Sequence, residues 1–248
     1  MVSHERRFFC RSPDGSIIYT TDGSFIFAEK DGVVMRLDMF AGHYYKLRPY
    51  NGVPVLEVDG LRMQLVKDFR TPLDYSNEVV KGLHIPESKG AAPDTSVALD
   101  TCMGLGYTAI ALAKKSGVKM VVTCELSEAV ITLAKWNPFS DMVFAKGSKI
   151  VLMEGSIAER IKSFDSGMFS YIIHDPPRVS HAPELYSSAF YAELYRVCRK
   201  GARIFHYVGS VGKTKGRRID REVEKRLSAA GFTGIRYVPR LQGMFGTK

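Results

Sequence analysis

The chain has 248 residues, of which 45% are hydrophobic and 25% are charged, a composition typical of a globular protein. This length suits one full domain with a small addition. No apolar run is long enough to span a membrane and none follows the charged start as in a secretory signal, so we expect a cytoplasmic protein. We expect no metal site and no disulfide framework, because the four cysteines are scattered, at Cys10, Cys102, Cys124 and Cys198.

The net charge of +9 is concentrated near the end of the chain. Residues 196–248 hold 14 Lys or Arg and three acids, whereas the remaining residues hold 21 basic and 23 acidic side chains. A basic end on a nearly neutral body favours a polyanionic partner, most often nucleic acid. A solubilising basic surface is the alternative.

Residues 1–70 are predicted to form a small antiparallel β domain, for which RNA binding is one function to consider. Strands are expected at 16–20, 24–28, 33–37 and 53–58. They are separated by Asx-Gly pairs, which supply the positive φ angles of tight hairpins. These pairs are Asp14-Gly15, Asp22-Gly23, Asp31-Gly32, Asn51-Gly52 and Asp59-Gly60.

Residues 71–95 are predicted to be a helix followed by a linker. Thr71 is a typical N-cap and Pro72 a typical first helical residue, so the helix should run to about Leu83. Residues 86–95 are rich in Pro, Gly, Ser and Ala, which indicates a loop.

Residues 96–248 alternate strands and helices, which predicts an α/β, Rossmann-like, doubly wound and mainly parallel sheet. Seven strands are expected, at 97–100, 119–124, 149–153, 169–174, 202–208, 234–238 and 243–245. Helices are expected at 107–115, 127–135, 157–163, 183–198 and 217–230. Ligands of such sheets bind beyond the carboxyl ends of the strands, so functional motifs are expected there.

A glycine motif follows the first of these strands. Gly104 and Gly106 allow a ligand to approach the backbone closely, at the start of a helix that attracts negative charge. Glu125 ends the second strand, where a carboxylate accepts hydrogen bonds from ribose hydroxyls. The third glycine of a dinucleotide fingerprint is missing, with Ala109 in its place, and Asp100 precedes the motif. This combination favours S-adenosylmethionine over NAD, and Cys102 lies in the same loop.

The end of the third strand is the expected adenine site. Gly155 and Ser156 stand there, and Ser156 offers a hydroxyl where methyltransferases often have Asp. Trp136 ends the preceding helix and is interpreted either as a second adenine contact or as a core residue.

The most specific motif is Asp175-Pro176-Pro177-Arg178, which ends the fourth strand. An exocyclic base amine is a poor nucleophile because its lone pair conjugates with the ring. The Asp175 carboxylate and the Pro176 carbonyl, held stiff by two prolines, are suited to bind its two hydrogens and to direct its lone pair at a methyl group. Asp175 is also a candidate general base.

These residues resemble the class I S-adenosylmethionine-dependent methyltransferase family, in its amino-methylating Asp-Pro-Pro branch. The resemblance covers about residues 94–248 and extends to archaeal predicted methyltransferases with a small N-terminal β domain. It implies an RNA substrate, ribosomal RNA before transfer RNA, with N4 of cytidine as the methylated atom. The family normally has an aromatic residue where this chain has Arg178, which can stack through its guanidinium or bind phosphate. Candidates for the missing stack are Tyr107, Tyr186, Phe190 and Tyr191, although aromatic residues of helices are more often core residues.

A basic loop follows the fifth strand and is predicted to bind the RNA backbone. We use this name for residues 209–218, whose predicted RNA contacts are Lys213, Lys215, Arg217 and Arg218. An exposed basic turn is the alternative. Residues 44–50 form a second aromatic and basic strip, equally compatible with a packed strand.

Three other functions stay open at this point. Guanine N2 or adenine N6 methylation fits the motif as well as cytosine N4 does. Aminopropyl transfer in the manner of spermidine synthase uses the same fold but needs further acids for its polyamine, and Arg178 opposes it. A non-catalytic RNA-binding protein on this fold is opposed by the presence of Asp100, Glu125 and Asp175 together.

Overall fold

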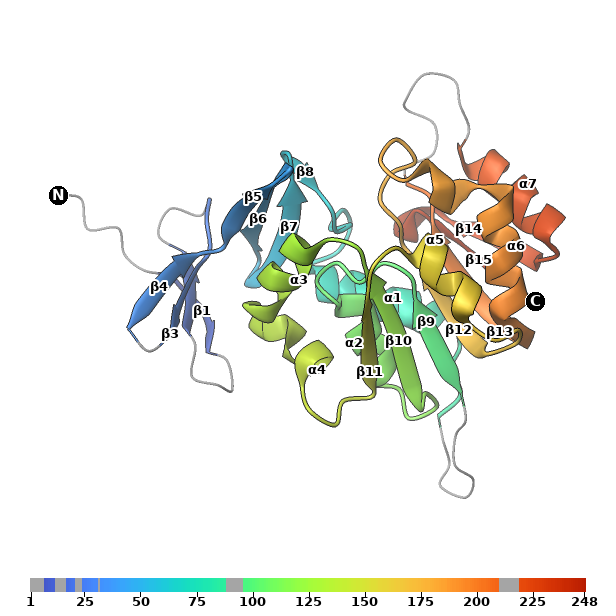
Figure 1. Cartoon of the computed structure of the whole chain (residues 1–248), viewed down its shortest axis with the longest axis horizontal. Helices are drawn as coiled ribbons and strands as arrows, with labels where there is room; N and C mark the ends of the chain where they lie inside the picture. Colours follow the sequence, from blue (N-terminus) through green and yellow to red (C-terminus); the bar gives the residue numbers. More distant parts are fainter. Residues whose placement is uncertain (1–6, 12–16, 21–23, 31, 88–95, 210–218) are drawn as a thin grey trace.

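The computed structural model describes residues 7–11, 17–20, 24–30, 32–87, 96–209 and 219–248. Two four-stranded antiparallel sheets form the N-terminal part, and Figure 1 shows the first of them at the far end of an elongated molecule. The first sheet contains β1 (Arg7–Arg11), β2 (Ile17–Thr20), β3 (Phe27–Lys30) and β4 (Val33–Arg36). The second contains β5 (Asp38–Ala41), β6 (His43–Tyr50), β7 (Val53–Val58) and β8 (Leu61–Arg62).

Two of the predicted hairpin turns are confirmed directly. Asn51 and Gly52 have φ angles of 46° and 80°, and Asp59 and Gly60 have 48° and 79°. Positive φ at both central residues gives the turn twist that two-residue hairpins require. The strand expected at 24–28 is displaced and begins at Phe27, because Ile26 lies before the ladder and accepts a hydrogen bond from the Leu37 backbone.

The rest of the chain forms the predicted Rossmann-like, mainly parallel, seven-stranded sheet. Its strands, from edge to edge, are β11 (Ile150–Glu154), β10 (Met120–Glu125), β9 (Val97–Asp100), β12 (Phe169–His174), β13 (Cys198–Tyr207), β15 (Gly243–Thr247) and β14 (Thr233–Val238). The first five are parallel, and β15 runs antiparallel to both β13 and β14. The order changes direction beside β9, so the topological switch point lies between β9 and β12.

Helices cover both faces of this sheet. They are α1 (Pro72–Gly82), α2 (Tyr107–Ala113), α3 (Glu128–Lys135), α4 (Asp141–Phe144), α5 (Ile157–Arg160), α6 (Ser188–Val197) and α7 (Ile219–Ala230). Short 3₁₀ turns are η1 (Pro138–Ser140), η2 (Ile161–Ser163), η3 (Pro183–Tyr186) and η4 (Pro239–Leu241). The single helix expected at 183–198 is instead η3 followed by α6, because the extended Ser187 ends the first and caps the second through Phe190 N–H.

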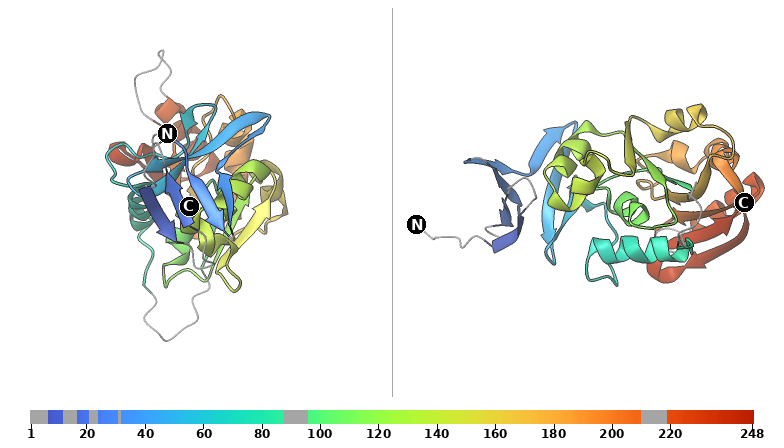
Figure 2. Two further views of the ribbon diagram at one scale, coloured as in Figure 1. Left: turned by 90° about the vertical axis from the view of Figure 1, so that its left-hand side faces the viewer. Right: turned by 90° about the horizontal axis from the view of Figure 1, so that it is seen from below.

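Each face of the sheet has its own hydrophobic core. Residues of α1–α4 pack on one face, and residues of α5–α7 pack on the other, so neighbouring residues of a strand alternate between cores: Ile173 belongs to the first and Ile172 to the second. The right-hand view of Figure 2 shows teal α1 and yellow α5 on opposite sides of the sheet. None of the helices in the described part of the chain is long and apolar enough to cross a membrane.

Helix α1 begins as the sequence predicts. The Thr71 hydroxyl accepts from the Asp74 backbone, and the Asp74 carboxylate accepts from the Thr71 backbone, which forms a complete capping box. The helix packs against α2 on the first face and buries Tyr75 and Val79 there. This placement brings Tyr75 to the carboxyl edge of the sheet.

Candidate functional site

The motifs that lie far apart in sequence meet at one edge of the sheet. Asp100 ends β9, Glu125 ends β10, and Asp175 directly follows β12. In the parallel ladders Asp100 is opposite both Thr123 and Ile173, and His174 is opposite His206. The next residues, Asp175 and Tyr207, therefore stand side by side at the carboxyl ends of β12 and β13.

Glu125 ties together the two turns around it. One of its carboxylate oxygens accepts from Gly104 N–H at 2.9 Å, and the other accepts from Ser127 N–H at 2.9 Å. Burial raises the pKa of Glu125 against the lowering effect of these backbone bonds. A carboxylate has about four lone-pair sites, so Glu125 keeps capacity to accept from ribose after these bonds and that of the Leu126 backbone.

The loop between β9 and α2 makes a tight bend at its glycines. Gly104 and Gly106 have φ angles of 53° and 76°, which L side chains rarely adopt. A Cβ on Gly106 would lie 2.5 Å from a methyl of Val143, whereas a Cβ on Gly104 would have only the Gln64 amide within 4 Å, at 3.8 Å. A Cβ at Gly104 would therefore be in ordinary van der Waals contact with Gln64 of the N-terminal part, so the backbone is less crowded there than at Gly106.

Asp100 is fully buried beneath this loop. Its two oxygens accept from the hydroxyls of Thr108, at 3.0 Å, and Thr123, at 2.7 Å. Burial raises the pKa of Asp100 to about 7 despite these hydrogen bonds. We interpret Asp100 as the residue that fixes the start of α2, and its direct contact with a cofactor stays a prediction.

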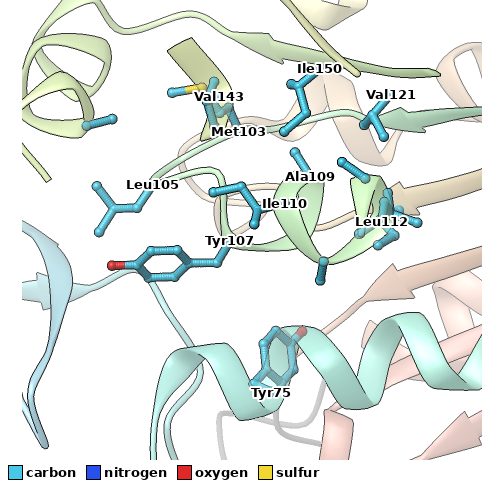
Figure 3. Close-up of a cluster of buried hydrophobic side chains, with 14 of the residues drawn as sticks. Tyr75, Met103, Leu105, Tyr107, Ala109, Ile110, Leu112, Val121, Val143 and Ile150 are labelled. Atoms are coloured by element: carbon cyan, nitrogen blue, oxygen red, sulfur yellow. The ribbon is translucent and has the colours of Figure 1, made fainter. Parts of the chain in front are cut away.

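A buried polar network, which sequence reasoning missed, fastens the glycine loop to the N-terminal sheet. Asn137 donates to Tyr107 and Ser140, the Tyr107 hydroxyl donates to the Pro54 carbonyl, and the Ser140 hydroxyl donates to the Leu105 carbonyl. In Figure 3 the Tyr107 hydroxyl points toward the strand of the N-terminal part. The cofactor loop and the N-terminal β structure are therefore braced against each other.

The expected adenine site has a hydroxyl that is not used for capping. Ser156 is the N-cap of α5, but its side chain makes no capping hydrogen bond. Sequence reasoning overlooked Leu126, which follows Glu125 and is 72% exposed at this edge. Trp136 packs against the first core, which supports its interpretation as a core residue, and burial raises the pKa of the Cys102 thiol.

Asp175 contacts the hydroxyl of Tyr75. This hydroxyl donates to a carboxylate oxygen of Asp175 across 3.4 Å, and the Tyr75 ring packs edge-on against Phe69 at 5.5 Å between centroids. Tyr75 is only 3% exposed, whereas Asp175 is partly exposed. Burial raises the pKa of Asp175 to about 7, and the Tyr75 hydrogen bond opposes the shift. Nothing in the sequence around Tyr75 pointed to this contact, 100 residues from Asp175.

Hydrogen bonds from the buried side chains of Tyr186 and His174 fix the Asp-Pro-Pro segment and the residue before it. Tyr186 donates to the Pro177 carbonyl at 2.9 Å. His174 contacts the Thr101 hydroxyl at 2.7 Å and donates through its other ring nitrogen to the Leu185 carbonyl, 3.0 Å away. Burial lowers the pKa of His174 to about 3, so the ring is neutral. Because Thr101 belongs to the β9 turn, His174 links the cofactor loop to the segment that carries Asp175.

The structure supports the core alternative for the four aromatic candidates for stacking. Each is 5% exposed or less and belongs to a hydrophobic core. They are Tyr107, Tyr186, Phe190 and Tyr191. Arg178 is exposed beside the motif, as its predicted contact with base or phosphate requires.

The predicted RNA contacts of the basic loop lie outside the described residues and stay predictions. The second aromatic and basic strip is the packed strand β6: Lys46 and Arg48 both pair with Glu57, at 3.0 and 3.3 Å. Within the described ranges, no three His, Cys, Asp or Glu side chains are arranged to hold a metal ion.

Comparisons with known proteins give one close relative and several structures of the same fold. No protein-family model matches the chain. The uncharacterized protein MJ1233 of Methanocaldococcus jannaschii is 36% identical over 255 residues, which cover 100% of this chain and 84% of that protein.

Two solved spermidine synthases each align with 99% of this chain. One, in complex with the transition state analogue AdoDATO, gives a TM-score of 0.69 at 17% identity over 81% of its length. The other, from Thermotoga maritima, gives 0.64 at 16% identity over 79%. A SAM dependent methyltransferase from Aquifex aeolicus gives 0.47 at 20% identity, over 69% of this chain and 87% of its own. At 17% and 16% identity, the likeness to the two spermidine synthases shows the fold alone.

Proposed function

This chain belongs to the same family as the M. jannaschii protein MJ1233, and we propose that it is an S-adenosylmethionine-dependent RNA methyltransferase that acts on an exocyclic base amine. One observation carries the proposal: the partly exposed Asp175 lies at the switch point, directly after β12, the strand next to the one that carries the glycine loop. A hydrogen-bond acceptor in this place can hold a substrate amine next to a methyl donor bound over the glycine loop.

Residues at the carboxyl edge of the sheet are suited to bind the different parts of S-adenosylmethionine. Glu125 accepts from the ribose hydroxyls, the exposed Leu126 gives the flat adenine an apolar contact, and Ser156 offers it a hydroxyl. The methionine part would lie at Gly104, where the absence of a side chain allows close approach to the backbone. S-adenosylmethionine would supply there a methyl group activated by a sulfonium, with a neutral thioether as the leaving group.

Asp175 and the Pro176 carbonyl orient the amine. The carboxylate accepts one N–H, the carbonyl accepts the other, and the lone pair is turned out of the ring toward the methyl. As the N–C bond forms, the nitrogen loses a proton, and Asp175 is the acceptor already in contact with it. A pKa near 7 makes Asp175 a matched acceptor at neutral pH.

The RNA substrate rests on charge and on the family resemblance. Residues 196–248 carry 14 basic and three acidic side chains, and this segment follows Asp175 in the chain and includes the basic loop. Among bases we propose N4 of cytidine in ribosomal RNA. The geometry treats the amines of cytosine, adenine and guanine alike, so only the resemblance favours cytidine.

Aminopropyl transfer is the second candidate, favoured by the likeness to spermidine synthases over 99% of the chain, N-terminal sheets included. Against it stands the charge of the site: Asp175 is bordered by the exposed Arg178, and Asp100 is fully buried with both oxygens occupied. An aliphatic polyamine cation needs further free carboxylates.

The test uses nucleosides as the readout. The purified protein is incubated with methyl-labelled S-adenosylmethionine and unmodified ribosomal RNA transcribed in vitro, and the digested RNA is examined by mass spectrometry. The proposal predicts label on N4 of cytidine, and label on N6 of adenine or N2 of guanine would correct only the base. Label on ribose or on a ring carbon would contradict the amine mechanism. Conversion of putrescine with the decarboxylated cofactor would establish the second candidate.

A further inference from the structure

The proposed base lacks an aromatic partner in the motif itself. Arg178 replaces the expected aromatic residue, and the four aromatic side chains considered from the sequence are buried. Tyr75 touches Asp175 but is also buried, so it offers no face to a base. A flipped base that presents its amine to Asp175 still needs a flat surface to lie on.

Tyr207 occupies the required position. It ends β13 directly beside Asp175, because the preceding pair, His206 and His174, is in register. Side chains alternate along a strand, so Tyr207 shares the face of Phe205, and it packs against the first core, to which Tyr75 also belongs. Unlike the buried candidates, Tyr207 is partly exposed.

Tyr207 lies close enough to Asp175 and Arg178 for both charges to act on it. Burial raises the pKa of Tyr207 to about 12, with the negative charge of Asp175 acting in the same direction and the positive charge of Arg178 opposing the shift. Both charges therefore act on the same phenol.

The backbone around Tyr207 is fixed. The next two residues, Val208 and Gly209, both donate to the Gln242 carbonyl, at 2.9 and 3.1 Å, and the Tyr237 hydroxyl donates to the Gly209 carbonyl at 3.3 Å. A ring held in place loses little freedom when a base stacks on it. The basic loop begins at Gly209, so the proposed backbone contacts follow the ring directly in the chain.

We propose that Tyr207 is the base-stacking residue of this site and takes the place of the aromatic side chain that Arg178 has replaced. The inference rests on the proposed function, since it concerns the same RNA base. Tyr207 sets the plane of the base, and Asp175 then selects the amine at its edge. Tyr207 would therefore bind the base, whereas Asp175 would orient its amine nitrogen.

The test compares variants of Tyr207 in methyl transfer to the in vitro transcribed ribosomal RNA. Tyr207→Leu removes the flat ring and should lower kcat/KM about 5- to 150-fold, the range that a lost base–aromatic stack covers. Tyr207→Phe keeps the ring and should stay within about threefold of the unaltered protein, since a stack uses the ring and not the hydroxyl. Tyr195→Leu is the matched control, because this half-buried tyrosine lies near the start of β13, at the opposite edge of the sheet. Affinity for S-adenosylmethionine should be unchanged in all three variants.

A further variant reads out stacking directly. Tyr207→Trp adds an indole to a chain whose only other tryptophan is Trp136, and stacking on a base should quench the fluorescence of the added indole when RNA is bound. Unaltered kcat/KM in Tyr207→Leu, or unquenched emission of the added indole at saturating RNA, would overturn the stacking role while the proposed function stands. Failure of the unaltered protein to methylate RNA would overturn both.

Discussion

Replacing Tyr75 with Phe should move the pH dependence of methyl transfer without changing the fold. The substitution removes only the hydroxyl that donates to Asp175, and the ring keeps its edge-on contact with Phe69. Hydrogen bonds to charged groups contribute about 1.5–3 kcal/mol, and a long bond of 3.4 Å belongs below that range, at about 1 kcal/mol. This corresponds to a rise of about 0.7 in the pKa of Asp175, because about 1.36 kcal/mol is one pKa unit.

The direction of the pH shift follows because only the ionised carboxylate of Asp175 accepts from the amine. The pKa of Asp175 is already raised to about 7, so transfer should increase with pH through neutrality. In Tyr75→Phe the midpoint of the pH–rate profile should move to higher pH. The rate at about pH 7 should fall about threefold and should recover by about pH 9. Single-turnover transfer of labelled methyl across about pH 6–9 measures this shift.

Tyr44→Phe is the matched control, because the Tyr44 hydroxyl also donates to a carboxylate, that of Asp38, but in the N-terminal part. Its pH profile should coincide with that of the unaltered protein. An unchanged midpoint in Tyr75→Phe would refute the coupling between α1 and Asp175.

Three further predictions concern the cofactor loop and the RNA. Gly106→Ala should cost about 2–4 kcal/mol of folding stability in denaturant titrations, because of its strained φ and the contact with Val143. The control Gly147→Ala, with φ of 78° and no neighbour within 4 Å, should cost about 1–2 kcal/mol. Equal losses would contradict the packing argument. Glu125→Ala should weaken S-adenosylmethionine binding in calorimetry by about 1.5–3 kcal/mol, and unchanged affinity in the folded variant would remove the ribose assignment. Replacing the four basic residues of the basic loop should flatten the dependence of RNA affinity on salt while cofactor affinity stays constant; an unchanged slope would mean that the phosphates are bound elsewhere.

The sheet could be predicted from sequence because its signals are local. Each strand of the α/β part is a short apolar run, and the polar residue that ends it, such as Asp100 or Glu125, marks the carboxyl edge. The N-cap residue Thr71 predicted the start of α1 correctly, and the helix expected at 127–135 begins at Glu128 with Ser127 as its cap.

The remaining parts depend on contacts between distant segments. Tyr75 reaches Asp175 across 100 residues, and the Tyr107–Asn137 network joins α2 to the N-terminal β7, neither of which a local pattern reveals. The aromatic residues of η3 and α6 could not be assigned from sequence for the same reason. Their helical spacing fits a core and a binding surface equally, and only the packed structure shows that Tyr186 and Tyr191 face inward.

The most direct test of the central claim compares the unaltered protein with two Asp175 variants in transfer of labelled methyl to unmodified ribosomal RNA. Asp175→Ala removes the acceptor and should lower the rate by about 10²–10³, the typical loss when one positioned hydrogen-bond partner is removed from a site. Asp175→Asn keeps an amide oxygen that accepts from the amine, so its loss should be smaller, and both variants should retain S-adenosylmethionine binding. With the unaltered protein, label should appear on a base nitrogen. Undiminished RNA methylation by folded, cofactor-binding Asp175→Ala would contradict the claim that this carboxylate orients the amine.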